Sequence, residues 1–134
     1  MRQFLSPEFD NEKFSSEAIV WRRIAKQGYL VRYINEIYRN AEIQTGGLSD
    51  PNQMLKRLIN NPKGLALRYN EEVHIMPSFL LKLKSSINYV RCSLHANYSF
   101  WTIIMGALEK RYLLLSLFAG YVLSKYDLSK FNKK

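Results

Sequence analysis

The apolar stretch over residues 101–123 constrains the fold most, because a helix of this composition needs burial on several sides. Such a helix would be long enough to cross a bilayer, but Glu109, Lys110 and Arg111 would lie near its centre. A basic side chain at the bilayer midplane costs roughly 2.5–3.5 kcal/mol. The remaining apolar run, residues 112–123, has the length of a buried core helix. We therefore expect no membrane span, and burial by the rest of the domain or by a second copy of the chain.

The length and composition indicate one globular domain in a reducing compartment. A chain of 134 residues forms one hydrophobic core, which excludes separate cofactor and substrate lobes. Its 47% hydrophobic content, with only six Gly and four Pro, is that of an ordinary globular fold. The single cysteine, Cys92, has no internal disulfide partner, and the polar first ten residues do not resemble a secretory signal. We expect a cytoplasmic, nucleoid-associated or nucleus-associated protein.

The first part of the chain predicts an arm followed by two helices. Residues 1–14 show no sustained period and are expected to form an N-terminal arm. A helix is expected to begin at Ser15 or Ser16, where a serine can cap the exposed amides, and to end near Gly28. Residues 29–41 repeat apolar side chains at helical spacing, which predicts a second helix.

The next segment predicts a short helix and a β-hairpin. Asp50-Pro51-Asn52-Gln53 is typical of a helix start, because Asp caps exposed amides and Pro fits the first turn. The run Asn-Asn-Pro-Lys-Gly at residues 60–64 should end that helix. The period then changes to alternation over residues 65–69 and 73–75, with a polar turn at 70–72 between them. This pattern predicts a small two-stranded hairpin.

The last part of the chain predicts two long helices. The helical period resumes after Ser78, and a second C-terminal helix is expected from about Tyr98 to Tyr126. We expect residues 78–134 to form a dimerisation or interaction region with a basic tail. The apolar residues 98–126 would join the two copies of a homodimer.

The order of helix, helix, short capped helix and hairpin resembles the winged helix-turn-helix superfamily. The residues that carry the resemblance are Met-Leu-Lys-Arg-Leu-Ile at 54–59, Gly-Leu-Ala-Leu-Arg at 64–68, and Val-His-Ile-Met-Pro at 73–77. Among the branches of the superfamily, the chain is most similar to the MarR- and PadR-type regulators. The resemblance implies a mainly α fold, with a winged-helix-like unit of three helices and a hairpin over residues 15–77. It also implies that the short helix is a recognition helix for duplex DNA.

The net charge of +9 favours an anionic partner such as nucleic acid, a membrane surface or an acidic protein. Residues 78–134 carry nine basic and two acidic side chains, a net +7. Residues 15–77 carry nine basic and six acidic side chains, a net +3. Most of the excess therefore lies in the last third of the chain.

The candidate site residues are those that read base edges or bind phosphates. Asn and Gln pair with adenine, and Arg and Lys pair with guanine, so the short helix carries suitable groups for the major groove. Basic residues on the first helix, beside the wing, on the first C-terminal helix and in the tail would add phosphate contacts. The residues that we expect to contact nucleic acid are Asn52, Gln53, Lys56, Arg57, Asn60, Arg68, Arg22, Arg23, Lys82, Lys84, Lys130, Lys133 and Lys134.

No motif in the chain indicates catalysis, a cofactor or a metal site. Cys92 and His95 share a helix face, and His74 is the only other histidine, which is too few ligands for a structural zinc site. The chain holds no Gly-rich phosphate loop and no nucleophile elbow. We expect a protein that is not an enzyme and that has no cofactor.

The sequence thus predicts a duplex-DNA-binding protein that regulates transcription or replication. The alternative is a helical adaptor or inhibitor protein, of the kind found in viruses and mobile elements, that binds an acidic protein partner or a nucleoprotein complex. The nine tyrosines, interleaved with basic residues, leave stacking on single-stranded bases as a further alternative.

Overall fold

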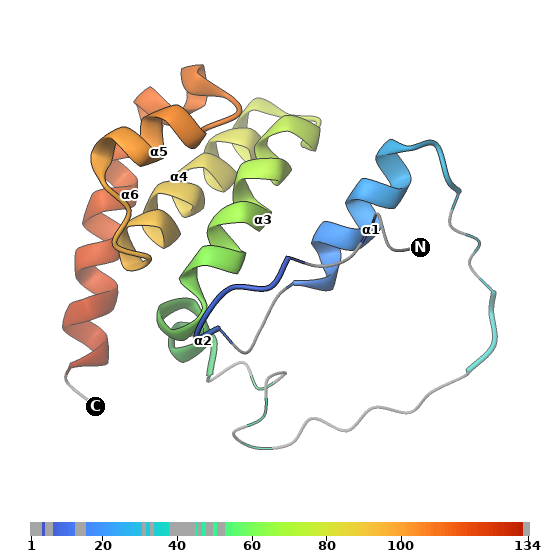
Figure 1. Ribbon diagram of the computed structural model, residues 1–134, viewed down its shortest axis with the longest axis horizontal. Coiled ribbons are helices and arrows are strands. Elements are labelled where there is room, and N and C mark those ends of the chain that lie inside the picture. Colours follow the sequence, from blue (N-terminus) through green and yellow to red (C-terminus); the bar gives the residue numbers. More distant parts are fainter. Residues whose placement is uncertain are drawn as a thin grey trace.

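The computed structural model describes residues 4, 7–12, 16–30, 32, 34–37, 45, 47, 50 and 53–132, and these contain six helices and no strand. The prediction of a mainly α fold is confirmed (Figure 1). The helices in chain order are α1 (Glu17–Lys26), α2 (Met54–Asn60), α3 (Pro62–Ile75), α4 (Phe79–His95), α5 (Phe100–Gly106) and α6 (Lys110–Phe131).

The first predicted helix is present as α1, but the second predicted helix is wrong in the described residues. The chain leaves α1 through Gly28, whose φ of 85° is in the left-handed region, and residues 29, 30, 32 and 34–37 are irregular. Leu30 and Ile37, which belong to the predicted apolar stripe, are 98% and 87% exposed. An apolar stripe stabilises a helix only when it packs on a partner, and this one has none among the described residues. The other positions of the prediction lie outside those residues.

The predicted hairpin is also wrong, because residues 65–75 belong to α3. Asn61 links α2 directly to α3, and Pro62 occupies the first turn of the new helix, where its missing amide hydrogen is not needed. Leu65, Ala66 and Val73 are buried at helical spacing. The alternating apolar residues fit a strand as well as a helix, and packing against α4 selected the helix.

The N-terminal arm supplies a cap for α3. The carboxylate of Glu12 accepts hydrogen bonds from the backbone amides of Lys63, at 2.6 Å, and Gly64, at 2.8 Å. These amides belong to the first turn of α3 and have no partner within the helix. The contact therefore joins the arm to the helical body and stabilises the start of α3.

We expect Glu12→Ala to lower the free energy of unfolding by about 1–2 kcal/mol, because it leaves two amides of α3 without an acceptor. Urea denaturation followed by circular dichroism measures the change. Asp10→Ala, which removes an exposed carboxylate from the same arm, is the matched control and should change stability by less than about 0.5 kcal/mol. Equal losses in the two variants would contradict a capping role for Glu12.

The predicted long helix over residues 98–126 is divided into α5 and α6. The side chain of Asn70 on α3 makes two hydrogen bonds at the division. Its amide nitrogen donates to the carbonyl oxygen of Gly106 at 2.7 Å, and its amide oxygen accepts from the backbone nitrogen of Leu108 at 3.0 Å. These bonds satisfy backbone groups that a continuous helix would have paired internally, so the chain can turn between the two helices.

Helix α4 is the centre of the helical body and packs on both α3 and α6. It begins as expected at Ser78, whose hydroxyl accepts a hydrogen bond from the backbone nitrogen of Leu81 at 3.4 Å. The hydroxyls of Ser86 on α4 and Ser116 on α6 are 2.8 Å apart. Further along, Arg91 of α4 contacts Asp127 of α6, so the two helices run in the same direction. The short α5 carries the chain back to the start of α6 (Figure 1).

Candidate nucleic-acid interface

The acidic residues of the helical body are paired inside the molecule. Residues 53–132 contain four of them, Glu71, Glu72, Glu109 and Asp127. Glu71, Glu72 and Asp127 each form an ion pair with an arginine, and Glu109 lies 3.2 Å from Nδ1 of His74 and 3.9 Å from Nη2 of Arg111. Of the carboxylates near these helices, Glu12 of the arm binds backbone amides of α3 rather than a cation.

Two of these pairs attach α1 to α3. Arg22 Nη2 lies 2.7 Å from Glu72 Oε1, and Arg23 Nη2 lies 2.6 Å from Glu71 Oε1. From the sequence, Arg22 and Arg23 were expected to contact phosphates, and both glutamates were expected to lie in the polar turn at residues 70–72. In the structure, a phosphate would have to compete with a carboxylate that already binds each arginine.

Asp127 forms the most buried charged network of the described residues. Its carboxylate accepts hydrogen bonds from Arg91 Nε at 2.5 Å and Arg91 Nη2 at 2.6 Å, and it lies 3.0 Å from His95 Nε2. Burial by itself raises the pKa of Asp127, but the hydrogen bonds from Arg91 and His95 outweigh it, and the pKa is lower than usual. The hydrogen bond to Asp127 is also the main cause that raises the pKa of Arg91. The network fixes the carboxyl-terminal ends of α4 and α6 to each other.

Cys92 and His95 do not form a metal or catalytic site in the described part of the chain. Cys92 is fully buried in the core, and burial raises the pKa of its thiol to about 12. It is therefore a protonated thiol at neutral pH and a poor ligand or nucleophile. His95 is engaged with Asp127. The described residues contain no group of three or more potential ligands that could hold a metal ion.

The expected recognition helix corresponds to α2. It begins at Met54, a turn after the predicted start at Asp50, and it buries Leu58 as the pattern indicates. Lys56 and Asn60 are exposed, one turn apart on the same face, whereas Gln53 and Arg57 are half-buried. Asn52 lies outside the described residues.

The other expected contact residues fall into separate regions. Arg68 lies on α3, half-buried, with its guanidinium 5.3 Å from the centre of the Tyr69 ring. Lys82, near the start of α4, lies 5.7 Å from the ring centre of Tyr112 in the first turn of α6, and Lys84 follows it. Lys130 lies at the far end of α6, a helix of 22 residues and about 33 Å. Lys82 and Lys84 are therefore distant from Lys130.

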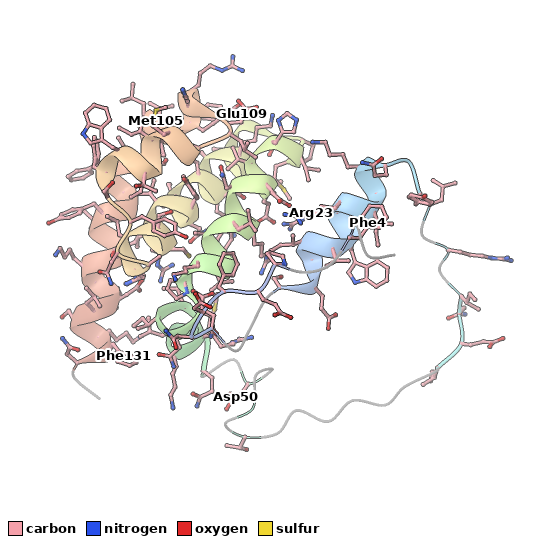
Figure 2. All side chains as sticks on the ribbon, in the orientation of Figure 1. Phe4, Arg23, Asp50, Met105, Glu109 and Phe131 are labelled. Carbon is pink, nitrogen blue, oxygen red and sulfur yellow. The ribbon has the colours of Figure 1, made fainter. Side chains whose placement is uncertain are left out.

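One end of the molecule does bring several cations together. Helix α2 contacts α6. In Figure 2, Phe131, the last residue of α6, lies at the same lower end of the molecule as Asp50, which precedes α2 by four positions. We call this region the α2 end and define it by Lys56, Arg57, Asn60, Lys63 and Lys130. The tail residues Lys133 and Lys134 lie outside the described residues.

Sequence reasoning missed Lys63 because residues 60–64 were interpreted as an exit loop. The signal was present, since Pro is common in the first turn of a helix and Pro62 directly precedes Lys63. In the structure, Lys63 is half-buried in the first turn of α3, next to the end of α2.

The chain matches no family model, no curated protein and no solved structure. The resemblance to winged-helix regulators rested on residues 54–77, and the part of this stretch that would form the wing is helical. The function of this protein must therefore be inferred from its own charges and exposed surfaces.

Proposed function

We propose that this protein is a non-enzymatic nucleic-acid-binding protein that contacts duplex DNA through the α2 end and acts in transcription or replication. The observation that carries the proposal is the internal pairing of all four acidic residues between 53 and 132. Lys56, Lys63 and Lys130 have no ion-pair partner among the described residues, so their charges are available to an external anion. A polyphosphate chain matches such a set of separate cations.

The geometry of α2 favours binding that depends mainly on phosphates. Lys56 and Asn60 project from one face of a helix of seven residues, which is about two turns. So short a helix presents few groups to base edges, of which the Asn60 amide suits adenine. The lysines of the α2 end would supply sequence-independent affinity. We therefore expect affinity for duplex DNA that falls steeply with salt.

The test is fluorescence anisotropy of a labelled random-sequence duplex, measured from low to physiological salt. Lys56→Gln with Lys130→Gln should weaken binding about tenfold at low salt and reduce the slope of log affinity against log salt by about 2, one for each lost phosphate contact. Lys82→Gln with Lys84→Gln is the matched control, because it removes the same charge from the first turns of α4, beside the start of α6 and far from Lys130. We expect its effect to be under about threefold.

Two results would contradict the proposal in different ways. Equal losses in both double variants would show that the α2 end is not a defined interface. No binding of the unaltered protein at low salt would exclude duplex DNA as the partner. The second result would favour the alternative prediction, an adaptor whose cations bind an acidic protein.

A further inference from the structure

Helix α6 packs on α4 largely through small residues and leaves most of its larger apolar side chains exposed. The side that packs against α4 carries small residues four positions apart, Ser116, Gly120 and Ser124, all of them buried. A Cβ atom at Gly120 would lie only 2.6 Å from Cβ of Val90, so the helix backbone approaches α4 very closely. Close packing through small residues is typical of helices whose larger apolar side chains are covered by something else.

The larger apolar side chains of α6 point away from the body. Leu114, Leu115, Phe118 and Val122 follow one another at helical spacing and are exposed, Phe118 by 80% and Leu114 by 75%. We call this stripe the outer face of α6. It is larger and more continuous than the single exposed apolar residues of a typical protein surface, which marks it as an interaction site.

Helix α5 carries a second pair of exposed apolar side chains. Trp101 and Met105, one turn apart, are 73% and 72% exposed. Figure 1 shows α5 and α6 together on the side of the helical body opposite α1. An exposed tryptophan beside an apolar stripe is common where a protein meets the boundary between lipid and water.

Both ends of the outer face carry cations. Arg111 precedes Leu114 by three positions, and Lys125 follows Val122 by three, so each continues the stripe of exposed residues. The Arg111 side chain is 88% exposed, and its Nη2 atom lies 3.9 Å from Oε2 of Glu109, the residue before α6. An ion pair of so exposed a side chain is weak, so the guanidinium can still reach an external anion. The Lys125 ammonium lies 5.5 Å from the centre of the Tyr121 ring. The only acidic residue within α6 is Asp127, which is buried and bound to Arg91. The outer face is therefore apolar in the middle and positive at both ends.

These charges disfavour a second copy of the chain as the occupant. If two α6 helices paired in opposite directions about Phe118, Arg111 of one would face Lys125 of the other, because each lies seven positions from Phe118. Pairing in the same direction would place each cation opposite its own copy. Both arrangements bring like charges together. The homodimer predicted for residues 98–126 stays a prediction that the structure does not test.

We propose that the outer face of α6, together with Trp101 and Met105, docks on an anionic lipid bilayer. Among the described residues, no helix is long and apolar enough to cross a membrane, so α6 would lie in the plane of the interface. In that orientation its apolar stripe enters the acyl region, while Arg111 and Lys125 reach lipid phosphates at both ends. This surface is separate from Lys56 and Asn60 of the α2 end, and the proposal does not depend on DNA binding.

The test is flotation of the full chain with vesicles of phosphatidylcholine mixed with phosphatidylglycerol, and with vesicles of phosphatidylcholine alone. The protein should float with the anionic vesicles and at least about tenfold less with the neutral ones. Leu114→Ser with Phe118→Ser should lower binding to anionic vesicles by about tenfold for each side chain. Leu30→Ser with Ile37→Ser is the matched control, because it removes two apolar residues that are even more exposed from outside the outer face, and it should leave flotation unchanged.

A second measurement separates insertion from simple charge attraction. In a Trp21→Phe background, Trp101 is the only tryptophan, and its fluorescence emission should shift to shorter wavelength on anionic vesicles. Circular dichroism checks that the variants keep their helices, which is expected because the replaced side chains are exposed.

Four results would overturn the proposal. Absence of flotation with the anionic vesicles is the first, and equal flotation with both vesicle types is the second. The third is equal loss in the control variant and the variant of the outer face. The fourth is a dimer, detected by light scattering, that Leu114→Ser with Phe118→Ser converts to a monomer, because a second copy would then cover the face.

Discussion

Asp127→Ala is expected to lower the free energy of unfolding by about 3–5 kcal/mol. The side chain of Asp127 is 3% exposed and that of its partner His95 is 2% exposed. Arg91, the second partner, would lose both of the hydrogen bonds that it donates to the carboxylate. Removing the carboxylate leaves the buried His95 and the partly buried Arg91 without their acceptor, which costs more than the pair itself contributes. Urea denaturation of the variant against the unaltered protein measures the loss.

A double variant separates the cost of an unpaired charge from the value of the ion pair. Asp127→Ala combined with Arg91→Met also removes the charge that the single variant leaves without a partner, and we expect it to recover part of the loss, while His95 remains without its acceptor. Stability as low as in Asp127→Ala would contradict this account. It would instead indicate that the shape of the buried site is what matters.

The same carboxylate predicts how stability depends on pH. The pKa of Asp127 in the folded protein is lower than in the unfolded chain, where it is about 3.9. Its contribution is therefore complete above the unfolded pKa and is lost as the pH falls through the folded pKa. Denaturation at a series of pH values should show the unaltered protein and Asp127→Asn converging below about pH 4. A constant difference across that range would contradict the assigned shift.

Gly120→Ala is expected to destabilise the protein by about 1–3 kcal/mol, although alanine favours helices over glycine by up to about 1 kcal/mol. The added Cβ would lie 2.6 Å from Cβ and 2.7 Å from Cγ1 of Val90, and 3.0 Å from the carbonyl oxygen of Ile87. Real Cβ atoms do not approach this closely, so α4 and α6 would have to separate. Thermal unfolding followed by circular dichroism would show a lower midpoint.

Two further variants test whether Val90 is the cause. Val90→Gly removes both Cβ and Cγ1, the two atoms of Val90 that the added Cβ would meet, so the combination with Gly120→Ala should be more stable than the sum of the two single effects predicts. Ser129→Ala changes an exposed residue on the same helix and should shift stability by less than about 0.5 kcal/mol. Additive effects of the Val90 and Gly120 variants would show that the two residues do not meet.

Residues close to the start of a helix allowed us to predict where some of the helices begin. The serines at positions 16 and 78 indicated the starts of α1 and α4. The Ser78 hydroxyl caps α4 as expected, whereas Ser16 precedes α1 without a cap hydrogen bond from its side chain. The boundary between α2 and α3 was only half predicted. Pro62 was interpreted as the end of one helix, and it also begins the next.

The candidate site was predictable in composition but not in arrangement. The exposed Lys56 and Asn60 on one helix face follow from their spacing, since residues four apart share a face. No local signal shows that Arg22 and Arg23 bind Glu72 and Glu71, which lie about fifty positions away along the chain. Long-range ion pairs decide which cations remain available, and they form only when helices pack.

The sequence by itself determined that this chain is mainly helical, carries its positive charge in the last third and cannot form an internal disulfide. These properties depend on residue type and short-range period. Only the tertiary structure decided that residues 65–75 form a helix, and that α6 turns its small residues inward and Leu114, Leu115 and Phe118 outward. The physical reason is that an apolar pattern indicates how much hydrophobic surface must be buried, but it does not determine which helix or partner buries it. Close packing of α6 on α4 through small residues left most of the larger apolar side chains of α6 on its outer face.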